Sequence, residues 1–172
     1  MSKKKFLSIA VALVLPQLAG GLGAVATQSS VSTWYRQLRK PPWTPPSWIF
    51  APVWTTLYLF MGLASWLVWQ KDQEQTRLIR PEQEERKRLA LGVYGVQLAL
   101  NTLWSLIFFG MRNLHWALLE IVVLWAAILE TVRRFFRIRP LAGWLLVPYL
   151  LWSSFATALN ASIWWLNRDT GE

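Results

Sequence analysis

Five long apolar stretches recur along the chain, and short polar segments separate them. Their approximate limits are residues 6–26, 48–69, 89–111, 114–132 and 141–166. A helix that crosses the hydrocarbon core of a bilayer needs about 20 mostly apolar residues, and each stretch reaches or approaches that length. The pattern therefore predicts an all-α fold: a bundle of five transmembrane helices that forms one domain over residues 1–172.

The first stretch has a second interpretation. Lysines at positions 3–5, an apolar core and the small residues at 24–26 resemble a cleavable signal peptide. Pro16 and the glycines at 20, 21 and 23 favour instead a helix that packs closely on its neighbours.

Charge orients the predicted bundle. The net charge is +9, and of the 18 Lys and Arg residues 13 lie in the N-terminal tail, the 70–88 loop and the 133–139 loop. The positive-inside rule then places the N-terminus in the cytoplasm and the 27–47 loop on the opposite side. Because these charges lie in loops between spans, we expect no nucleic-acid partner.

The 27–47 loop is rich in proline and tryptophan. Pro41-Pro42 and Pro45-Pro46 predict a stiff, non-helical segment, because proline fixes its own φ and pushes the preceding residue towards extended conformations. A stiff aromatic loop at the mouth of a bundle is typical of a lid over a pocket. The alternative is that Trp34, Trp43 and Trp48 only form an aromatic belt at the membrane interface.

Few polar side chains fall inside the spans. Gln97 and Asn101 lie one helical turn apart, and they either form an interhelical hydrogen bond or face a ligand. Glu130 lies near the arginines at 133–139 and is expected to pair or snorkel there. Glu120 has Arg112 or the proline-rich loop as possible partners.

Residue content excludes several chemistries. The chain has no cysteine, so it has neither disulfides nor zinc–thiolate sites. His115 is the single histidine, which excludes a multi-histidine metal site but leaves one haem axial ligand open. No metal site or hydrolytic triad is expected. The 13 tryptophans exceed what interfacial anchoring needs, and flat walls with a few amides suit a planar ligand such as a porphyrin or sterol.

Specific motifs span nearly the whole chain. The first reads Trp34-Tyr35-x-x-Leu38-x-Lys40-Pro41-Pro42-Trp43-Thr44-Pro45-Pro46-x-Trp48, and later ones read Gln97-Leu98-Ala99-Leu100-Asn101-x-x-Trp104 and Pro148-Tyr149-Leu150-x-Trp152-x-x-Phe155-Ala156-x-x-Leu159-Asn160. On these motifs the chain resembles the translocator protein family, which includes the tryptophan-rich sensory proteins of bacteria and the peripheral-type benzodiazepine receptor of mitochondria.

The resemblance implies a five-helix membrane bundle, usually a homodimer, with a pocket beneath the first long loop. Family members bind porphyrins, isoquinoline carboxamides and, in animals, cholesterol. We therefore expect a porphyrin, protoporphyrin IX or haem, as the ligand, with membrane lipid around the bundle and no required cofactor. A stripe of Gly92, Gly95 and Ala99 suits helix–helix contact, within the subunit or across a dimer.

The resemblance also implies site residues. Trp54 and Trp152 match the tryptophans implicated in light-dependent breakdown of protoporphyrin IX, the one enzymatic activity we consider. The expected ligand-binding residues include family pocket positions that match Asn101, Trp104, Trp116, Ala156 and Leu159. The full expected set is Trp43, Tyr58, Gln97, Asn101, Trp104, Trp116, Ala156, Leu159 and Asn160.

One departure bears on the ligand. The animal proteins carry a tyrosine and then an arginine after the Leu-Asn pair, whereas this chain continues Ala161-Ser162-Ile163-Trp164-Trp165. That disfavours a dedicated sterol role and favours a bacterial setting. The leading hypothesis is a membrane porphyrin-binding protein with a sensory or regulatory role, and the alternative is a porphyrin or sterol transporter. A third hypothesis, a structural protein whose tryptophans only anchor it, predicts no saturable ligand binding.

Overall fold

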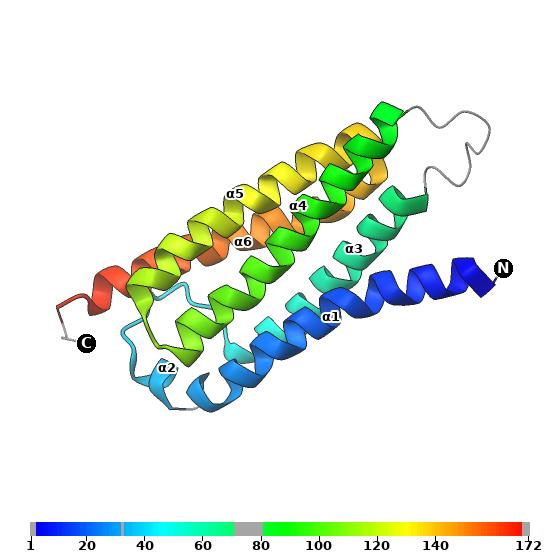
Figure 1. The fold of residues 1–172 in the computed structure, drawn as a ribbon. Helices are drawn as coiled ribbons and strands as arrows, with labels where there is room; N and C mark the ends of the chain where they lie inside the picture. The colour runs from blue at the N-terminus through cyan, green and yellow to red at the C-terminus, as the bar shows by residue number, and fades with distance from the viewer. Residues whose placement is uncertain (1–2, 32, 71–80, 170–172) are drawn as a thin grey trace.

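The computed structural model describes residues 3–31, 33–70 and 81–169, and these residues form a bundle of helices (Figure 1). Five helices are long and apolar enough to cross a membrane. They are α1 (Lys3–Val31), α3 (Phe50–Gln70), α4 (Pro81–Ser105), α5 (Leu114–Ile138) and α6 (Pro140–Asn167). The expected all-α fold with five transmembrane helices is confirmed.

Most of the helices extend beyond their apolar stretches, because hydropathy marks only the part of a helix that lies in hydrocarbon. The largest extensions are at Pro81, where α4 begins, and at Ile138, where α5 ends. Two short helices, α2 (Trp34–Gln37) and η1 (Ser47–Ile49), occupy part of the segment expected to be a loop. Residues 38–46 between them are non-helical, as the proline pairs predict. The charged residues 71–80 lie outside the described part of the chain.

The five long helices pack in a ring. α1 contacts α3, α3 contacts α6, α6 contacts α5, α5 contacts α4, and α4 returns to α1. The N-terminus, the first turn of α4 and the α5–α6 corner lie at one end of the bundle, whereas α2, the 111–113 turn and the C-terminus lie at the other (Figure 1). The basic segments of the sequence therefore share one end.

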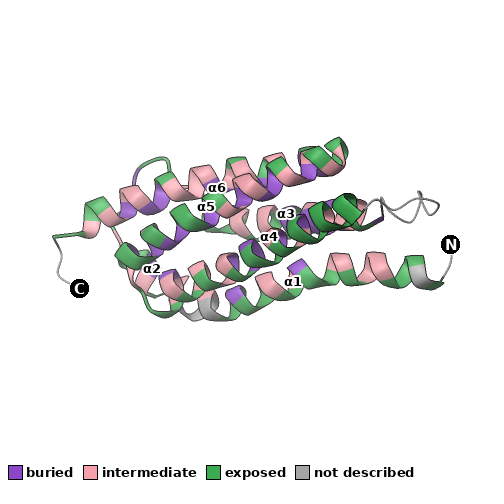
Figure 2. Ribbon diagram, turned by 45° about the horizontal axis from the view of Figure 1, so that its top comes forward, coloured by how far each residue is buried: buried purple, intermediate pink, exposed green. Residues whose placement is uncertain are grey.

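The interior of the ring is filled mainly from α3, α4, α5 and α6. Met61, Phe135 and Tyr149 are among its fully buried side chains. α1 differs from the other four helices, because only Pro16, Gly23 and Ser30 are buried among its described residues and most of its large apolar side chains are exposed (Figure 2). These side chains are Phe6, Leu7, Val11, Val14, Leu15, Leu18, Leu22 and Val25. In a bilayer they contact lipid, so α1 joins the bundle through small residues rather than through a large buried face.

Glycines set the distance between α1 and its neighbours. A Cβ atom added at Gly62 of α3 would lie 2.7 Å from the carbonyl oxygen of Ala12 and 2.9 Å from the Cα of Leu13. A Cβ added at Gly23 would lie 2.9 Å from Oγ of Ser105. The glycine cluster of α1 thus permits close helix packing, as the sequence predicted.

The last turn of α4 widens into a π-helical segment, η2 (Leu106–Gly110). The Met111 N–H closes it on the carbonyl of Leu106 at 2.8 Å, and Arg112 follows with a φ of 56°. The side chain of Asn113 then caps α5 by accepting a hydrogen bond from the Trp116 N–H at 3.0 Å. This tight turn makes α4 and α5 antiparallel neighbours and turns Phe108 and Phe109 towards α2.

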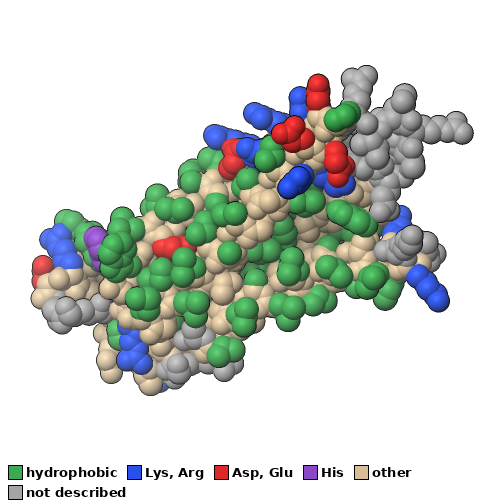
Figure 3. All heavy atoms as spheres, in the orientation of Figure 1, with side chains coloured by type: hydrophobic (Ala, Val, Ile, Leu, Met, Phe, Trp, Pro, Cys, Tyr) green, Lys and Arg blue, Asp and Glu red, His purple; other side chains and the backbone are tan. Residues whose placement is uncertain are grey.

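Charged side chains gather mostly at the two ends of the bundle, and apolar side chains cover its length (Figure 3). At the basic end, Glu130 forms the expected ion pair, with its Oε1 2.8 Å from Nε of Arg134. This distribution matches a bundle whose middle is surrounded by hydrocarbon and whose ends meet water.

Candidate functional site

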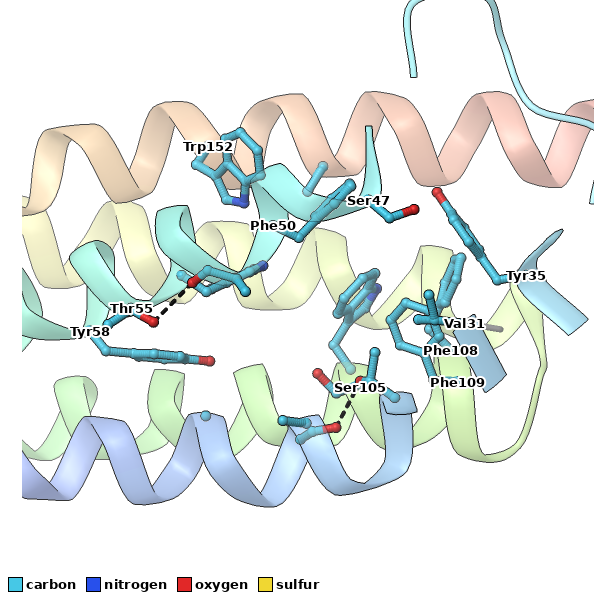
Figure 4. A pocket seen from close by; sticks show the side chains of 18 of the residues that line it. Val31, Tyr35, Ser47, Phe50, Thr55, Tyr58, Ser105, Phe108, Phe109 and Trp152 are labelled. Atoms are coloured by element: carbon cyan, nitrogen blue, oxygen red, sulfur yellow. Dashed lines mark hydrogen bonds between the residues drawn. The ribbon is translucent and has the colours of Figure 1, made fainter. Parts of the chain in front are cut away.

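A cavity of about 640 Å³ lies inside the bundle near α2, between α1, α3, η2 and α6 (Figure 4). Its volume falls in the range of about 300–1,000 Å³ that is usual for small-molecule sites. Its wall includes aromatic side chains from five elements; they are Tyr35, Phe50, Trp54, Tyr58, Trp104, Phe108, Phe109 and Trp152.

The rings of the wall support one another. Trp54 stacks on Tyr58 with centroids 5.5 Å apart and planes inclined by 29°. Across the cavity, Trp152 meets Phe50 edge-to-face at 5.9 Å. Such pairs favour offset and edge contacts and hold each ring in a fixed orientation. The wall therefore presents flat faces that are already in place before a ligand binds.

The cavity wall carries no ionisable acid or base of the Asp, Glu, Lys, Arg or His type among the described residues. Its polar groups are neutral and come from Gln17, Thr27, Ser47, Thr55, Ser105 and Asn160, together with the aromatic hydroxyl and indole groups. The indole Nε1 of Trp152 is buried without a hydrogen-bond partner, and it points into the cavity (Figure 4). It is a donor available to a carbonyl or carboxylate oxygen of a ligand.

Small residues of α1 leave the space that the cavity occupies. Gly20 lies directly against the ring of Tyr58, so a side chain there would displace that ring. Gly21 also lines the cavity, but a Cβ added to it would have no neighbour within 4 Å. The glycines of α1 therefore serve the cavity as well as helix packing.

A buried hydrogen-bonded chain leads from the cavity wall into the core. The hydroxyl of Tyr58 donates to Oδ1 of Asn101 at 2.6 Å. Nδ2 of Asn101 donates to the hydroxyl of Tyr149 at 3.2 Å, and that hydroxyl donates to Oε1 of Gln97 at 2.9 Å. Both amides expected in ligand contact thus lie behind the wall, where they join α3, α4 and α6.

A second bond network fixes the indole of Trp104. Its Nε1 donates to Oδ1 of Asn160 at 3.1 Å, and Nδ2 of Asn160 donates to the carbonyl of Leu114 at 3.3 Å. Helices α4, α5 and α6 are joined at this point. Asn160 therefore supports the cavity wall besides forming part of it.

The structure brings together most of the residues expected at the site. Seven of them line the cavity: Trp54, Tyr58, Trp104, Trp152, Ala156, Leu159 and Asn160. Gln97 and Asn101 lie behind it in the hydrogen-bonded chain. Trp43 does not line it but meets Phe155 at 5.7 Å, and Phe155 in turn contacts Trp152 at 5.4 Å. Trp116 lies away from the cavity, and 59% of its surface is exposed.

Several cavity residues were not expected from the sequence. Phe50, Phe108 and Phe109 line the cavity, as do Gly20 and Gly21. Phe108 and Phe109 reach it because α4 ends in a π-helical turn, and no residue pattern marks that turn in advance. Tyr35 lay within a quoted motif, but its helix was expected to be loop.

The non-helical segment 38–46, here called the strap, crosses the end of the bundle between α2 and η1. The ammonium group of Lys40 donates to the carbonyl of Tyr35 at 2.5 Å and lies 4.6 Å from the centre of the Tyr35 ring. Partial burial lowers the pKa of Lys40 from its ordinary value, whereas the carbonyl and the ring favour its charged form. Burial raises the pKa of the Tyr35 hydroxyl. The strap is thus attached to α2 beside the cavity.

Glu120 of α5 is buried, and no described residue forms a hydrogen bond with either of its carboxyl oxygens. Neither Arg112 nor any described residue of the proline-rich loop, its two possible partners, forms that pairing. Glu120 also lies outside the cavity wall. It is separate from the candidate site.

The fold and the cavity together define a multi-pass membrane protein of five helices with an internal aromatic site. Comparison with known sequences identifies the family: the profile of the TspO/MBR family matches residues 12–166, and the chain belongs to that family. A tryptophan-rich sensory protein from Cereibacter sphaeroides is 40% identical over 94% of this chain and 95% of its own length.

Two further relatives show the breadth of the family. The human translocator protein is 40% identical over 87% of this chain and 83% of its own length. The Tryptophan-rich protein TspO of Chlorobaculum tepidum is 38% identical over 95% of this chain and 98% of its own length. The resemblance inferred from the motifs is confirmed.

Proposed function

We propose that this protein binds a tetrapyrrole within the membrane and has a sensory or regulatory role. The observation that supports this best is the cavity of about 640 Å³, whose walls are flat aromatic rings with a few neutral polar groups. A porphyrin presents a large apolar plane that matches such walls. In this proposal the macrocycle lies between Trp54 and Trp152.

Charge determines how a porphyrin with propionate groups would lie. The cavity wall offers no cation, and a carboxylate inside a neutral cavity within the membrane is costly. The propionates would therefore point towards the strap end of the bundle, where Arg36 and Arg39 are exposed. Arginine pairs readily with carboxylates in a two-bond geometry.

The chemistry that we propose is light-dependent breakdown of bound protoporphyrin IX. A tryptophan in contact with the excited porphyrin would give it one electron, which leaves an indole radical cation and a porphyrin radical anion. Dioxygen would take that electron from the porphyrin radical anion and become superoxide, and the indole radical cation would then take one electron from the porphyrin and return to tryptophan. Superoxide would combine with the resulting porphyrin radical cation at a methine bridge, where the carbon–carbon and oxygen–oxygen bonds break and both oxygen atoms end as carbonyl oxygens of the opened ring. Trp54 and Trp152 are the tryptophans placed for this step.

The test is illumination of the protein–protoporphyrin complex, followed by porphyrin absorbance, in Trp54→Phe and Trp152→Phe. Phenylalanine keeps an aromatic wall but is much harder to oxidise. We expect both variants to bind the porphyrin and to lose most of the light-dependent bleaching. Unchanged bleaching in both would reject the photochemical role. Protoporphyrin flux into proteoliposomes above that of empty liposomes would favour the transport alternative.

Two further parts of the proposal follow from the family. A neutral, planar isoquinoline carboxamide would occupy the same cavity and compete with the porphyrin. A homodimer would form through α4, where Gly92 and Gly95 are exposed and have no neighbouring atom within 4 Å of an added Cβ. Close approach of a second helix requires such an open face.

A further inference from the structure

The strap is joined to the far end of α6 by one side-chain amide. Oδ1 of Asn167 accepts a hydrogen bond from the Arg39 N–H at 3.0 Å, and Nδ2 of Asn167 donates to the Arg39 carbonyl at 2.9 Å. Nδ2 also donates to the carbonyl of Ile163, one turn earlier in α6, at 2.7 Å. The amide is therefore held by its own helix while it holds both backbone groups of Arg39.

Other described bonds of the strap hold its own shape rather than its position on the bundle. The N–H and the hydroxyl of Thr44 both donate to the carbonyl of Pro41, at 3.0 and 2.7 Å. Lys40 bonds to carbonyls of α2, which is the element that leads into the strap. Trp43 of the strap also packs edge-to-face on Phe155 of α6, with ring centroids 5.7 Å apart. Breaking the two bonds between Asn167 and Arg39 would leave this ring contact, so the strap would open more readily while it keeps its internal turn.

We propose that Asn167 is the latch of the strap and thereby sets the rate at which ligand enters and leaves the cavity. This inference rests on the proposed function, since it concerns passage of the same ligand. Asn167 does not line the cavity, so it is a positioning residue that acts through the strap. Tyr35 of α2 and Ser47 of η1, which flank the strap, both line the cavity. A charged ligand group favours passage at this end, because a route through the side of the bundle would carry the charge into hydrocarbon.

The chemistry of the latch is specific to asparagine. An aspartate in its place would keep an acceptor for the Arg39 N–H but would direct a second acceptor at the carbonyls of Arg39 and Ile163. Asn167→Asp should therefore release the strap nearly as well as Asn167→Ala. Arg168→Ala is the matched control, since Arg168 lies on the same turn but contacts Trp165 and Asp169 rather than the strap.

The experiment is stopped-flow binding of protoporphyrin IX to the purified full-length chain in the dark. If the strap must open both for the ligand to enter and for it to leave, Asn167→Ala should raise the association and dissociation rate constants together, by about threefold to tenfold. The dissociation constant would change much less, and Arg168→Ala would leave both rates unchanged. A rise in the dissociation rate alone would mean that Asn167 only stabilises the bound state, which would overturn the proposal.

Unchanged rates in Asn167→Ala would also overturn the latch. A route between α1 and α3 would then be tested with Gln17→Ala, because Nε2 of Gln17 bonds to the carbonyl of Thr55 at 3.3 Å.

Hydrogen exchange gives a readout that needs no ligand. Amides of the strap should exchange faster in Asn167→Ala than in Arg168→Ala, and equal exchange would reject the latch. The absence of saturable porphyrin binding to the unmodified protein would reject only the proposed function.

Discussion

One tyrosine connects the candidate site to the core of the bundle. The ring of Tyr58 stacks on Trp54 in the cavity wall, and its hydroxyl donates to Asn101, which joins Tyr149 and Gln97. Buried polar groups are costly when they lose a partner, and this holds strongly where hydrocarbon surrounds the protein. The polar residues of the spans therefore support the site from behind.

Tyr58→Phe tests this role. The variant keeps the ring and its stacking on Trp54, but it removes the hydrogen bond to Oδ1 of Asn101. We expect a loss of stability of about 1–3 kcal/mol, because a buried acceptor is left without its donor. The measurement is thermal unfolding in detergent. Tyr35→Phe is the control, since the Tyr35 hydroxyl forms no hydrogen bond with a described residue, and an equal effect of both variants would contradict the account.

At the scale of elements, α1 is the helix least supported by a buried face. Its large side chains face outward, so its position depends on close contacts with α3 and α4. At one of these contacts, Gly62 of α3 lies against the backbone of α1, since an added Cβ would meet the carbonyl of Ala12 and the Cα of Leu13. A backbone cannot rotate away as a flexible side chain can.

We therefore expect Gly62→Ala to push α1 away from α3 and to cost about 1–3 kcal/mol. Gly21→Ala adds the same methyl group at a position of α1 with no neighbour within 4 Å and away from the proposed homodimer face, so it should be neutral or slightly stabilising. The measurement is the thermal unfolding midpoint of each variant, together with an assay of ligand binding to the cavity. Equal midpoints would show that the α1–α3 distance adjusts freely.

At the scale of the whole molecule, hydropathy was sufficient to predict five spans but not where their helices end. α1 and α4 continue past the apolar stretches, and α2 lies in a segment without apolar periodicity. The site was predicted best where tryptophans and small residues repeat on one face, as at Trp54, Tyr58, Trp152 and Ala156. Trp116 is also a tryptophan in an apolar span, but it lies on the outside of α5. Residue type alone does not tell whether a tryptophan faces the cavity or the outside of the bundle.

The orientation of the bundle is a further prediction at this scale. The chain has no cysteine, so a single cysteine introduced at either end of the bundle would be the only residue of the protein that a maleimide labels. In intact bacterial cells, a membrane-impermeant maleimide should label Arg36→Cys and should not label Arg137→Cys until the membrane is opened. The reverse pattern would contradict the predicted cytoplasmic N-terminus.

The central claim is that the internal cavity binds a porphyrin, and the most direct test fills that cavity. Gly21→Leu adds a side chain where the cavity leaves open space, and Ala126→Leu enlarges an exposed side chain of α5 that lies outside the cavity wall. Each protein is titrated with protoporphyrin IX in the dark, with tryptophan quenching and porphyrin absorbance followed together. We predict saturable binding that is weakened at least about tenfold, or about 1.4 kcal/mol, in Gly21→Leu and is retained in Ala126→Leu. Linear quenching that matches detergent controls, or equal binding by both variants, would contradict a porphyrin site in this cavity.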